Sequence, residues 1–349
     1  MITVIIPTRN RADLLALALK SFTQQTLSPE AFEVLVIDNG STDQTKATAQ
    51  AFSARLANLR YFYEPEPGLH SGRHRGMLEA RGEVLVFADD DIEAFPTWLE
   101  AISLNFEDRN VAMVGGNNLP RFASPPPYWI ADLWDFVDHA KRTLGYLSLI
   151  DFGEGRFVTS PHNIWGCNFS IRKDILLEAG GFHPDSFPND LLKYRGDGET
   201  YVSQYVKDRN LTAIFDSRAS IHHIIPDERL SLEYLLTRYR AQGISSSYAV
   251  TRANGKLLEM NSYLPIIGKY AKRIIRSITA PLFKNRQSSY LQLTKILLGI
   301  QLSHMRGFIF HQRQLRKDPD LLSWIKEKTY IKARSDIKFE KNGNAEQHI

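Results

Sequence analysis

The stretch EVLVFADDDIEAFPTWL, residues 83–99, is the part of the sequence from which the fold is best inferred. An apolar run of five residues, typical of a strand, ends directly in three carboxylates, Asp89, Asp90 and Asp91. Three like charges at the end of a buried strand repel one another, and each needs water or a counter-ion. The stretch therefore predicts a buried strand whose tip meets positively charged groups.

The sequence before this stretch alternates between strand and helix patterns. Apolar, β-branched runs predict strands at residues 3–8, 32–38, 59–65 and 83–88. The spacing of apolar residues between them predicts helices at 11–25, 41–56 and 71–81, the second with a capping box at Ser41 and Gln44 and the third ending at Gly82. Strands that alternate with helices over short connections predict an α/β fold with a mixed, mostly parallel sheet flanked by helices.

Polar residues follow three of the predicted strands. They lie in PTRNR (7–11), DNGSTD (38–43) and DDD (89–91). Ligands of parallel α/β sheets bind at the carboxyl ends of the strands. We therefore expect these three segments to converge on one crevice.

The length and composition of the chain limit the number of domains that it can form. The chain has 349 residues, of which 43% are hydrophobic, so one large domain with an appendage or two domains are expected. Residues 256–341 contain 18 Lys and Arg but 6 Asp and Glu, and helix patterns dominate from Ser231 onward. We expect an α/β domain at residues 1–225 and a basic, mostly helical C-terminal region at 226–349. The net charge of +4 is too small to indicate a nucleic-acid partner.

The cysteine content and the hydropathy of the sequence indicate where in the cell the protein is expected. Cys167 is the one cysteine, so no intrachain disulfide can form, and a cytoplasmic location is expected. The first residues lack a secretory pattern, and no apolar run is long enough to predict a transmembrane helix. The segment LPIIGKYAKRIIRSITAPLF (264–283) mixes isoleucines with Lys and Arg. It is either a helix lying on an anionic membrane surface, which would place the chain peripherally on the inner membrane face, or the solvated basic face of a packing helix.

The three aspartates have a specific chemical interpretation. Asp89 and Asp91 are two residues apart on an extended backbone, so their side chains point to the same side. Carboxylate oxygens are the ligands that hard divalent cations such as Mg²⁺ and Mn²⁺ prefer. The alternative is a solvated acidic turn, or an N-cap for the helix that follows.

Three segments together resemble family 2 glycosyltransferases of the GT-A fold. They are VIIPTRNR (4–11), VLVIDNGSTD (34–43) and GLHSGRHRGMLEARGEVLVFADDD (68–91), in this order and spacing, and the resemblance extends over residues 1–225. It implies a Rossmann-like sheet, a nucleotide-diphospho-sugar donor, a divalent cation and transfer that inverts the anomeric centre. The donor expected is a UDP-sugar. The acceptor it implies is a glycan or a lipid-linked sugar, as in polysaccharide biosynthesis.

The resemblance also implies roles for individual residues. Those expected at the nucleotide are Pro7, Thr8, Arg11, Asp38, Arg73, Asp89 and Asp90. Asp91 is expected to bind the metal directly. His74 stands where the family usually has asparagine, which leaves that contact open.

The family places its catalytic base at the start of a helix, which here corresponds to DGETYVSQYVKDRN (197–210). Counting back from the helix end aligns Glu199 with the base, and Asp197 is the alternative. The structural alternative is that both carboxylates only complement the positive end of the helix dipole.

Two further groups of residues complete the expected site. His222 and His223 are adjacent on a predicted strand, so their rings point to opposite faces, and His222 is favoured as a metal ligand. Trp165, Gly166 and Asn168 match the acceptor region of the family, although Trp165 suits a core equally well.

Two other functions are considered. A nucleotidyltransferase would carry a glycine-rich basic loop after the first strand, but residues 7–15 contain no glycine. A catalytically silent protein that binds sugar nucleotides or glycans would not need the carboxylates at 89–91 and 197–199. Both alternatives are therefore ranked below a metal-dependent glycosyltransferase.

Overall fold

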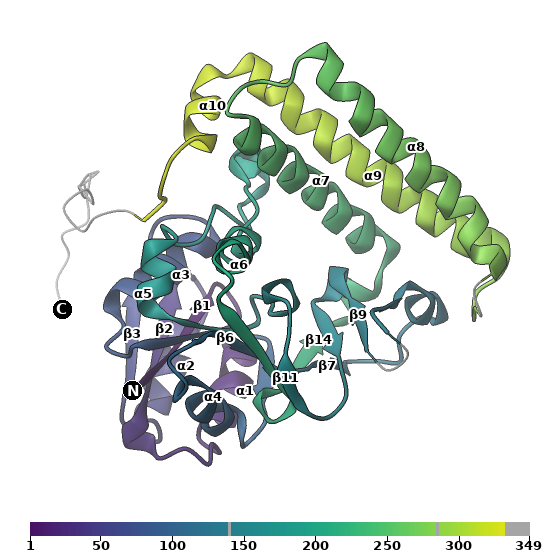
Figure 1. Ribbon diagram of the computed structural model, residues 1–349. Coiled ribbons are helices and arrows are strands. Elements are labelled where there is room, and N and C mark those ends of the chain that lie inside the picture. The colour runs from purple at the N-terminus through teal and green to yellow at the C-terminus, as the bar shows by residue number, and fades with distance from the viewer. Residues whose placement is uncertain (139–140, 284–285, 332–349) are drawn as a thin grey trace.

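The computed structural model describes residues 1–138, 141–283 and 286–331, and within them it contains two sheets and a layer of long helices (Figure 1). The larger sheet has the strand order β11-β13-β6-β12-β4-β1-β2-β3. Its strands are β1 (Ile2–Thr8), β2 (Phe32–Asp38), β3 (Leu59–Tyr63), β4 (Val84–Ala88), β6 (Val111–Gly115), β11 (Arg156–Val158), β12 (Asn168–Arg172) and β13 (Thr212–Asp216).

This sheet is mixed. Strands β4, β1, β2 and β3 run parallel to one another, as do β6 and β13. Strand β12 joins the two parallel groups by pairing antiparallel with both β4 and β6, and β11 is antiparallel to β13. The predicted fold class, a mixed and mostly parallel sheet flanked by helices, is confirmed.

Helices cover both faces of the larger sheet because its strands are apolar on both sides. They are α1 (Ala12–Phe22), α2 (Thr45–Phe52), α3 (Leu69–Glu79), α4 (Trp98–Phe106), α5 (Lys173–Glu178) and α6 (Glu199–Asp208). Along β1, Val4 and Ile6 face one core with α1 and α4, whereas Ile5 faces another core with α3, α5 and α6. This alternation is the period of two that side chains follow along a strand.

A second, smaller sheet lies beside the first, with the order β5-β14-β7-β10-β9-β8. Its strands are β5 (Ile92–Ala94), β7 (Asn118–Phe122), β8 (Asp135–Phe136), β9 (Arg142–Leu144), β10 (Leu149–Asp151) and β14 (Ile221–Ile225). Strand β5 follows the three aspartates directly and pairs with β14. The aspartates therefore lie where the chain passes from one sheet to the other.

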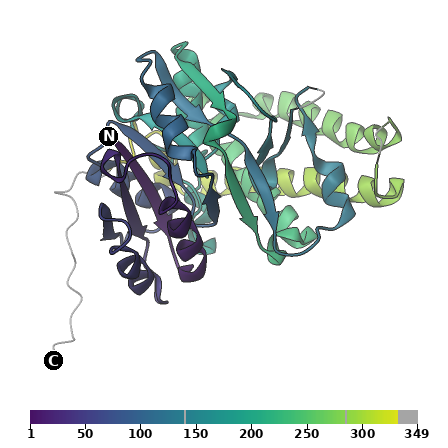
Figure 2. The same ribbon diagram turned by 90° about the horizontal axis from the view of Figure 1, so that it is seen from below.

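The C-terminal part of the described chain consists of α7 (Leu232–Asn254), α8 (Met260–Phe283), α9 (Tyr290–Lys317) and α10 (Pro319–Ile325). The three long helices form a layer over the sheets (Figure 1), and the view from below shows α8 and α9 at the opposite end of the molecule from the N-terminal strands (Figure 2). Within the described part of the chain, none of the helices combines the length and apolar character that a membrane span requires.

The helical layer shares a core with the second sheet. Leu144 and Leu149 of the sheet region pack with Leu235 of α7 and Ile300 of α9. Strand β14 ends at Ile225 and α7 begins at Leu232. The division of the chain at residue 225 into two domains stays a prediction.

Two predicted details at helix ends are wrong. The capping box at Ser41 and Gln44 does not form, because α2 begins at Thr45 and the Asp43 carboxylate accepts hydrogen bonds from the Thr45 amide at 3.0 Å and its hydroxyl at 2.5 Å. Helix α3 ends at Glu79, before the predicted end at Gly82.

Candidate active site

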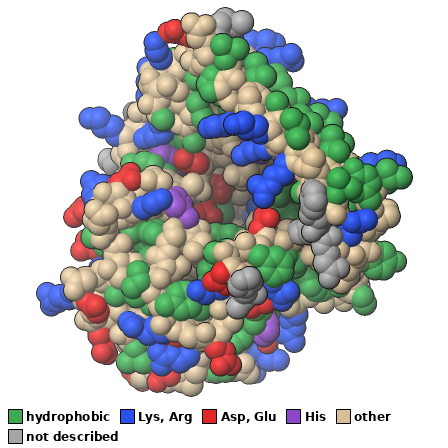
Figure 3. All heavy atoms as spheres, turned by 45° about the vertical axis from the view of Figure 1, so that its right-hand side comes forward, with side chains coloured by type: hydrophobic (Ala, Val, Ile, Leu, Met, Phe, Trp, Pro, Cys, Tyr) green, Lys and Arg blue, Asp and Glu red, His purple; other side chains and the backbone are tan. Residues whose placement is uncertain are grey.

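A pocket of about 490 Å³ opens at the carboxyl ends of β1 and β4. Its walls come from both sheets and from the starts of α6 and α7, and the space-filling view shows a hollow there with carboxylates inside and Lys and Arg near its rim (Figure 3). The residues of the aspartate motif, Arg11, Arg73, Glu199 and His223 all line it. The expected convergence of polar strand ends is therefore found for all three segments, although the second contributes Asn39 alone.

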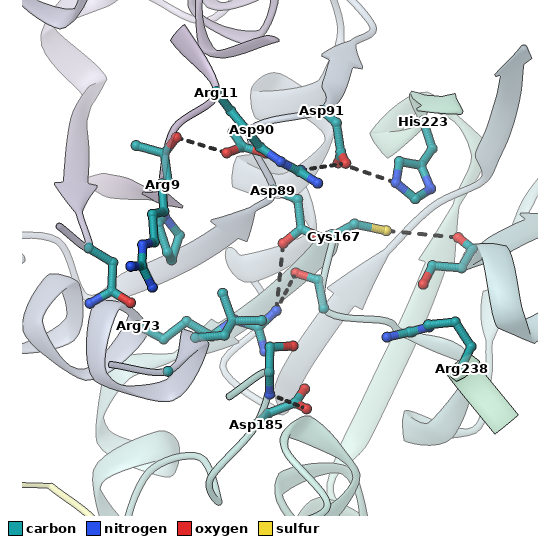
Figure 4. Close-up of a pocket in the computed structure, with 18 of the residues that line it drawn as sticks. Arg9, Arg11, Arg73, Asp89, Asp90, Asp91, Cys167, Asp185, His223 and Arg238 are labelled. Atoms are coloured by element: carbon teal, nitrogen blue, oxygen red, sulfur yellow. Dashed lines mark hydrogen bonds and ion pairs between the residues drawn. The ribbon is translucent and has the colours of Figure 1, made fainter. Parts of the chain in front are cut away.

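The three aspartates are met by guanidinium groups, as the sequence predicts. Arg11 Nη1 lies 2.8 Å from Asp90 Oδ1 and 2.9 Å from Asp91 Oδ2 (Figure 4). Arg229 Nη2 lies 2.6 Å from Asp91 Oδ2. Thr8 donates its hydroxyl proton to Asp90 Oδ2 at 2.8 Å. A buried carboxylate is tolerated only when cations or donors compensate its lost hydration, and these contacts provide that compensation.

The pKa values of Asp90 and Asp91 are shifted in opposite directions. Burial raises the pKa of Asp90 to about 6 against the opposing effect of Arg11. Burial acts on Asp91 as well, but His223, Arg229 and Arg11 together hold the pKa of Asp91 below its ordinary value. Asp91 is thus the carboxylate that stays charged over the widest pH range.

Arg73 connects the aspartates to the predicted base. Its side chain is buried, with Nη2 3.7 Å from Asp89 Oδ1 and Nη1 3.4 Å from Glu199 Oε2. Nη2 also donates to the Gly166 carbonyl at 3.2 Å. A side chain at Gly166 would overlap the Arg73 guanidinium, with its Cβ 3.2 Å from Glu199 Oε1, so glycine here leaves room for the guanidinium in its observed position.

The two candidate bases differ in their surroundings. Glu199 is the first residue of α6, its side chain is 27% exposed, and it faces the pocket. Asp197 Oδ1 lies 2.5 Å from His183 Nδ1, and the His183 ring stacks on Tyr201. Because Asp197 is committed to this internal contact, Glu199 is the better placed of the two to receive a proton from a ligand in the pocket.

Of the adjacent histidines, the structure places His223 at the carboxylates, whereas the sequence analysis favoured His222. His223 Nε2 lies 3.2 Å from Asp91 Oδ1 (Figure 4), while the His222 ring packs beside Phe95 at a centroid distance of 5.1 Å. The expectation that His222 reaches the site is corrected: the pairing of β14 with β5 and β7 turns His222 away and His223 inward.

The donor atoms near Asp91 fit a divalent cation. His223 Nδ1 donates to the Leu147 carbonyl at 2.9 Å, and Nε2 lies 3.2 Å from both Asp91 Oδ1 and Arg229 Nη1. Asp91 Oδ1 is buried and, apart from the 3.2 Å contact with His223 Nε2, no described residue donates a hydrogen bond to it. Among the described residues, no group of three or more His, Cys, Asp or Glu side chains is arranged to hold a metal. A cation here would therefore need ligands from a bound molecule as well.

The remaining predicted residues are divided between the pocket and the core. Pro7, Thr8 and Gly166 line the pocket. Asp38 does not line it, since its carboxylate accepts hydrogen bonds from Tyr61 Oη at 2.6 Å and the Ser41 amide at 2.7 Å. Asp38 is therefore placed to order the loop after β2, and its neighbour Asn39 lines the pocket instead.

In the predicted acceptor region, only part of the segment faces a cavity. Asn168 is buried in the core, where it accepts from Trp98 Nε1 at 2.9 Å and donates to the Ala219 carbonyl at 2.9 Å. Its placement corrects the expectation that it faces the acceptor. Trp165 lines a second cleft that adjoins the pocket at Glu199.

Sequence reasoning missed three basic residues of the pocket: Arg9, Arg229 and Arg238. Arg229 lies in a short 3-10 helix after β14, and no motif marks it. Arg238 lies in α7, three residues after Leu235, whose side chain is buried. A cation on the packing side of an amphipathic helix is the signal that identifies such a residue.

Comparisons with known proteins agree with this geometry. The family profile described as Glycosyl transferase family 2 matches residues 3–178. Glycosyltransferase AglE of Haloferax volcanii is 38% identical over 215 residues, which are 61% of this chain and 64% of AglE. The glucosyl-dolichyl phosphate glucuronosyltransferase of the same organism is 22% identical over 228 residues, 65% of this chain and 69% of that protein. The match to AglE thus spans less than two thirds of that relative.

Among solved structures, the mannosyltransferase PcManGT from Pyrobaculum calidifontis, in complex with GDP-Man and Mn²⁺, superposes with a TM-score of 0.51. It is 17% identical, and the match covers 95% of this chain and 84% of that one. At this identity the likeness bears on the fold alone.

Proposed function

The chain belongs to glycosyl transferase family 2, and from that membership we propose that it moves a sugar from a nucleotide-diphospho-sugar to a glycan or lipid-linked acceptor. The donor we propose is a UDP-sugar, and transfer inverts the anomeric centre in a single displacement. Residues 1–225 form the GT-A domain in this proposal, and residues 226–349 form a basic helical region that contributes Arg229 and Arg238 to the pocket.

One observation carries the proposal. The three aspartates, the buried Arg73 and Glu199 meet in one pocket, with Arg73 within 3.7 Å of Asp89 and within 3.4 Å of Glu199. The pocket therefore holds carboxylates suited to a metal–diphosphate at one side and the Glu199 carboxylate, paired with Arg73, at the other. A displacement at a sugar carbon requires groups of these two kinds.

Each residue has a role in the proposed reaction. Thr8 and Arg11 border the nucleotide, and Arg73 neutralises negative charge as the nucleoside diphosphate leaves. Glu199 takes the proton of the acceptor hydroxyl while its oxygen attacks the anomeric carbon from the side opposite the leaving group. The Gly166 amide, 3.4 Å from Glu199 Oε1, orients the carboxylate.

A divalent cation, Mg²⁺ or Mn²⁺, is part of the proposal. Asp91 and His223 would hold it, and a cation bound there supplies Lewis-acid stabilisation of the leaving diphosphate. The buried Asp91 Oδ1, to which no described residue donates a hydrogen bond apart from its contact with His223, supports this assignment. Arg229 contacts Asp91 and lies with Nη1 3.2 Å from His223 Nε2, so it holds these two groups in place.

The acceptor and the location are inferred from relatives and from charge. A relative named for glucosyl-dolichyl phosphate supports a lipid-linked acceptor. Helix α8 carries four Lys and Arg and no acidic residue, which supports peripheral contact with an anionic membrane from the cytoplasmic side.

A thermal-shift panel tests the proposal directly. UDP, GDP, their sugar conjugates and other nucleotides are added to the full chain with and without Mn²⁺, and a ligand of the native state raises the melting temperature by mass action. We expect a Mn²⁺-dependent shift with a uridine nucleotide, and we expect Asp91→Ala to abolish both this shift and turnover.

Other outcomes would replace the proposal. Unchanged metal-dependent activity in Asp91→Ala would remove the metal assignment. Release of pyrophosphate in place of nucleoside diphosphate would identify a nucleotidyltransferase. Donor binding without transfer or hydrolysis would identify a catalytically silent sugar-nucleotide-binding protein.

A further inference from the structure

The donor pocket continues into a second cleft of about 490 Å³ between the second sheet and α7. The two cavities share Glu199 and Arg238, so the proposed base stands at their junction. Trp165 and Tyr239 line the second cleft and offer aromatic faces to a sugar.

The second cleft in turn joins a third, a groove of about 790 Å³ bounded by α7, α8, α9 and the 3-10 helix at Tyr128–Leu133. The two share Asp135, Tyr239, Gln242 and Ser246. The three cavities are therefore contiguous. The donor pocket with the aspartates lies at one end of the series, and the groove lies at the other.

The groove combines apolar walls with two cations. Leu133, Phe136, Leu297 and Ile300 supply apolar surface. Arg273 and Arg276 lie three residues apart on α8, so both project from one side of the helix, and both line the groove. Among the residues that the structure describes, no ion pair joins either guanidinium to a carboxylate.

Two carboxylates, Asp132 and Asp135, also line the groove, so the two arginines do not give it a net positive charge. Both Asp132 oxygens accept hydrogen bonds at 2.8 Å, from the amides of Gln287 and Ser288. Asp135 lies at the junction with the second cleft, so it repels an anion from that end and favours the arginine end. Burial and Arg273 lower the pKa of His304 to about 4, so this lining histidine is neutral at pH 7.

Helix α8 also carries apolar side chains that are exposed. Ile275, Ile278 and Leu282 of α8 are exposed, at 60%, 43% and 59% of their surface. Isoleucine and leucine side chains in this position suit contact with lipid better than with water. The helix that contributes Arg273 and Arg276 to the groove thus also carries an apolar surface that a bilayer can contact.

We propose that this groove binds the phosphate and the adjoining lipid carbons of a phosphate-linked lipid acceptor. Arg273 and Arg276 bind the phosphate, the apolar wall takes the first part of the lipid, and the acceptor sugar extends through the second cleft to Glu199. This inference rests on the proposed function, because the groove serves the acceptor of that reaction. A second copy of the chain is disfavoured as the occupant, since α8 carries four cations and no anion, and two such surfaces repel.

Farnesyl phosphate is the probe that tests the proposal on the full chain by titration calorimetry. We expect it to bind at least tenfold more tightly than farnesol or inorganic phosphate, because both parts of the ligand contact the groove. The double variant Arg273→Gln/Arg276→Gln should weaken binding at least tenfold. Arg273→Lys/Arg276→Lys should recover part of the loss.

The matched control is Lys269→Gln/Lys272→Gln, which removes the same charge from the same helix at two exposed positions outside the groove. We expect this variant to bind farnesyl phosphate as the unchanged protein does. An equal loss of farnesyl phosphate affinity in both double variants would identify a general lipid surface and overturn the proposal. Binding to vesicles rich in anionic lipid that is as tight as binding to farnesyl phosphate would do the same.

The nucleotide shift of each variant separates this proposal from the proposed function. We expect the shift to be unchanged in the arginine variant, which also shows that the variant is folded. If the unchanged protein binds farnesyl phosphate but no nucleotide, the proposed function fails. If it binds nucleotide and transfers sugar while the arginine variant binds farnesyl phosphate normally, the groove assignment fails.

Discussion

At the scale of single residues, the site is a set of buried charges that compensate one another. Asp90 and Asp91 are almost fully buried, and a buried carboxylate without a partner costs several kcal/mol. Arg11 and Arg229 compensate them, while Arg73 lies between Asp89 and Glu199. Five arginines and five carboxylates line the pocket, so its formal charges balance.

Glu199→Gln tests the assignment of the base. The amide is nearly isosteric but cannot take the acceptor proton, so transfer should fall by roughly 10²–10⁴-fold. Binding of the donor nucleotide should persist, because the other donor-pocket residues are unchanged. Initial rates and the nucleotide-induced thermal shift measure the two effects separately.

Asp197→Asn is the matched control, because Asp197 contacts His183 within the protein. We expect it to keep most of the transfer activity. Full activity in Glu199→Gln together with loss in Asp197→Asn would assign the base to Asp197 instead.

At the scale of elements, the packing of α7 on α9 depends on two glycines. A Cβ at Gly243 would overlap the carbonyl oxygen of His304, and a Cβ at Gly307 would overlap that of Arg240. The backbones of the two helices thus approach directly, which positions Arg238 of α7 at the pocket and the groove between α7, α8 and α9.

Gly243→Ala should destabilise the protein because the obstacle is backbone, which cannot rotate away as a side chain can. Overpacking of this kind costs about 1–3 kcal/mol. The control is Gly268→Ala in α8, where nothing lies within 4 Å of the added Cβ. That change should stabilise by up to about 1 kcal/mol through helix propensity. Urea unfolding measures both, and equal effects would contradict the close approach of the helices.

At the scale of the whole molecule, buried histidines link stability to pH. Burial lowers the pKa of His74 to about 3 and that of His311 to about 4. The unfolded chain takes up protons on these rings below pH 6.5, whereas the folded protein does not. The contribution of these two histidines to the free energy of unfolding is therefore fully present above pH 6.5. It is lost as the pH falls toward the pKa values of the rings in the folded protein.

The contribution of His311 is measurable by itself. Its ring is fully buried beside Ser247, at 2.8 Å from the hydroxyl. From its pKa, it should account for about 2 kcal/mol of the stability lost between pH 7 and pH 5. Denaturant unfolding of His311→Asn at the two pH values should show a smaller difference than the unchanged protein.

The sequence by itself determined the strands and helices of the first ninety or so residues, because apolar periodicity is a local property. The same local pattern placed Asp89, Asp90 and Asp91 at a strand tip and required cations nearby. It could also align Glu199 with a helix start. Helix ends were less certain: Ser41 and Gln44 fit a capping pattern, yet Asp43 caps the helix because its carboxylate reaches Thr45.

Only the tertiary structure decided which distant groups meet. Arg229 reaches Asp91 from 138 positions away in the chain, and Arg73 reaches Glu199 across 126, separations over which no local pattern carries information. The choice between His222 and His223 depended on the register and orientation of β14, since adjacent side chains on a strand face opposite ways. The groove at Arg273 and Arg276 exists because α8 packs beside α7 and α9. Long-range pairing of strands and helices, rather than local propensity, thus selects the residues that form the site.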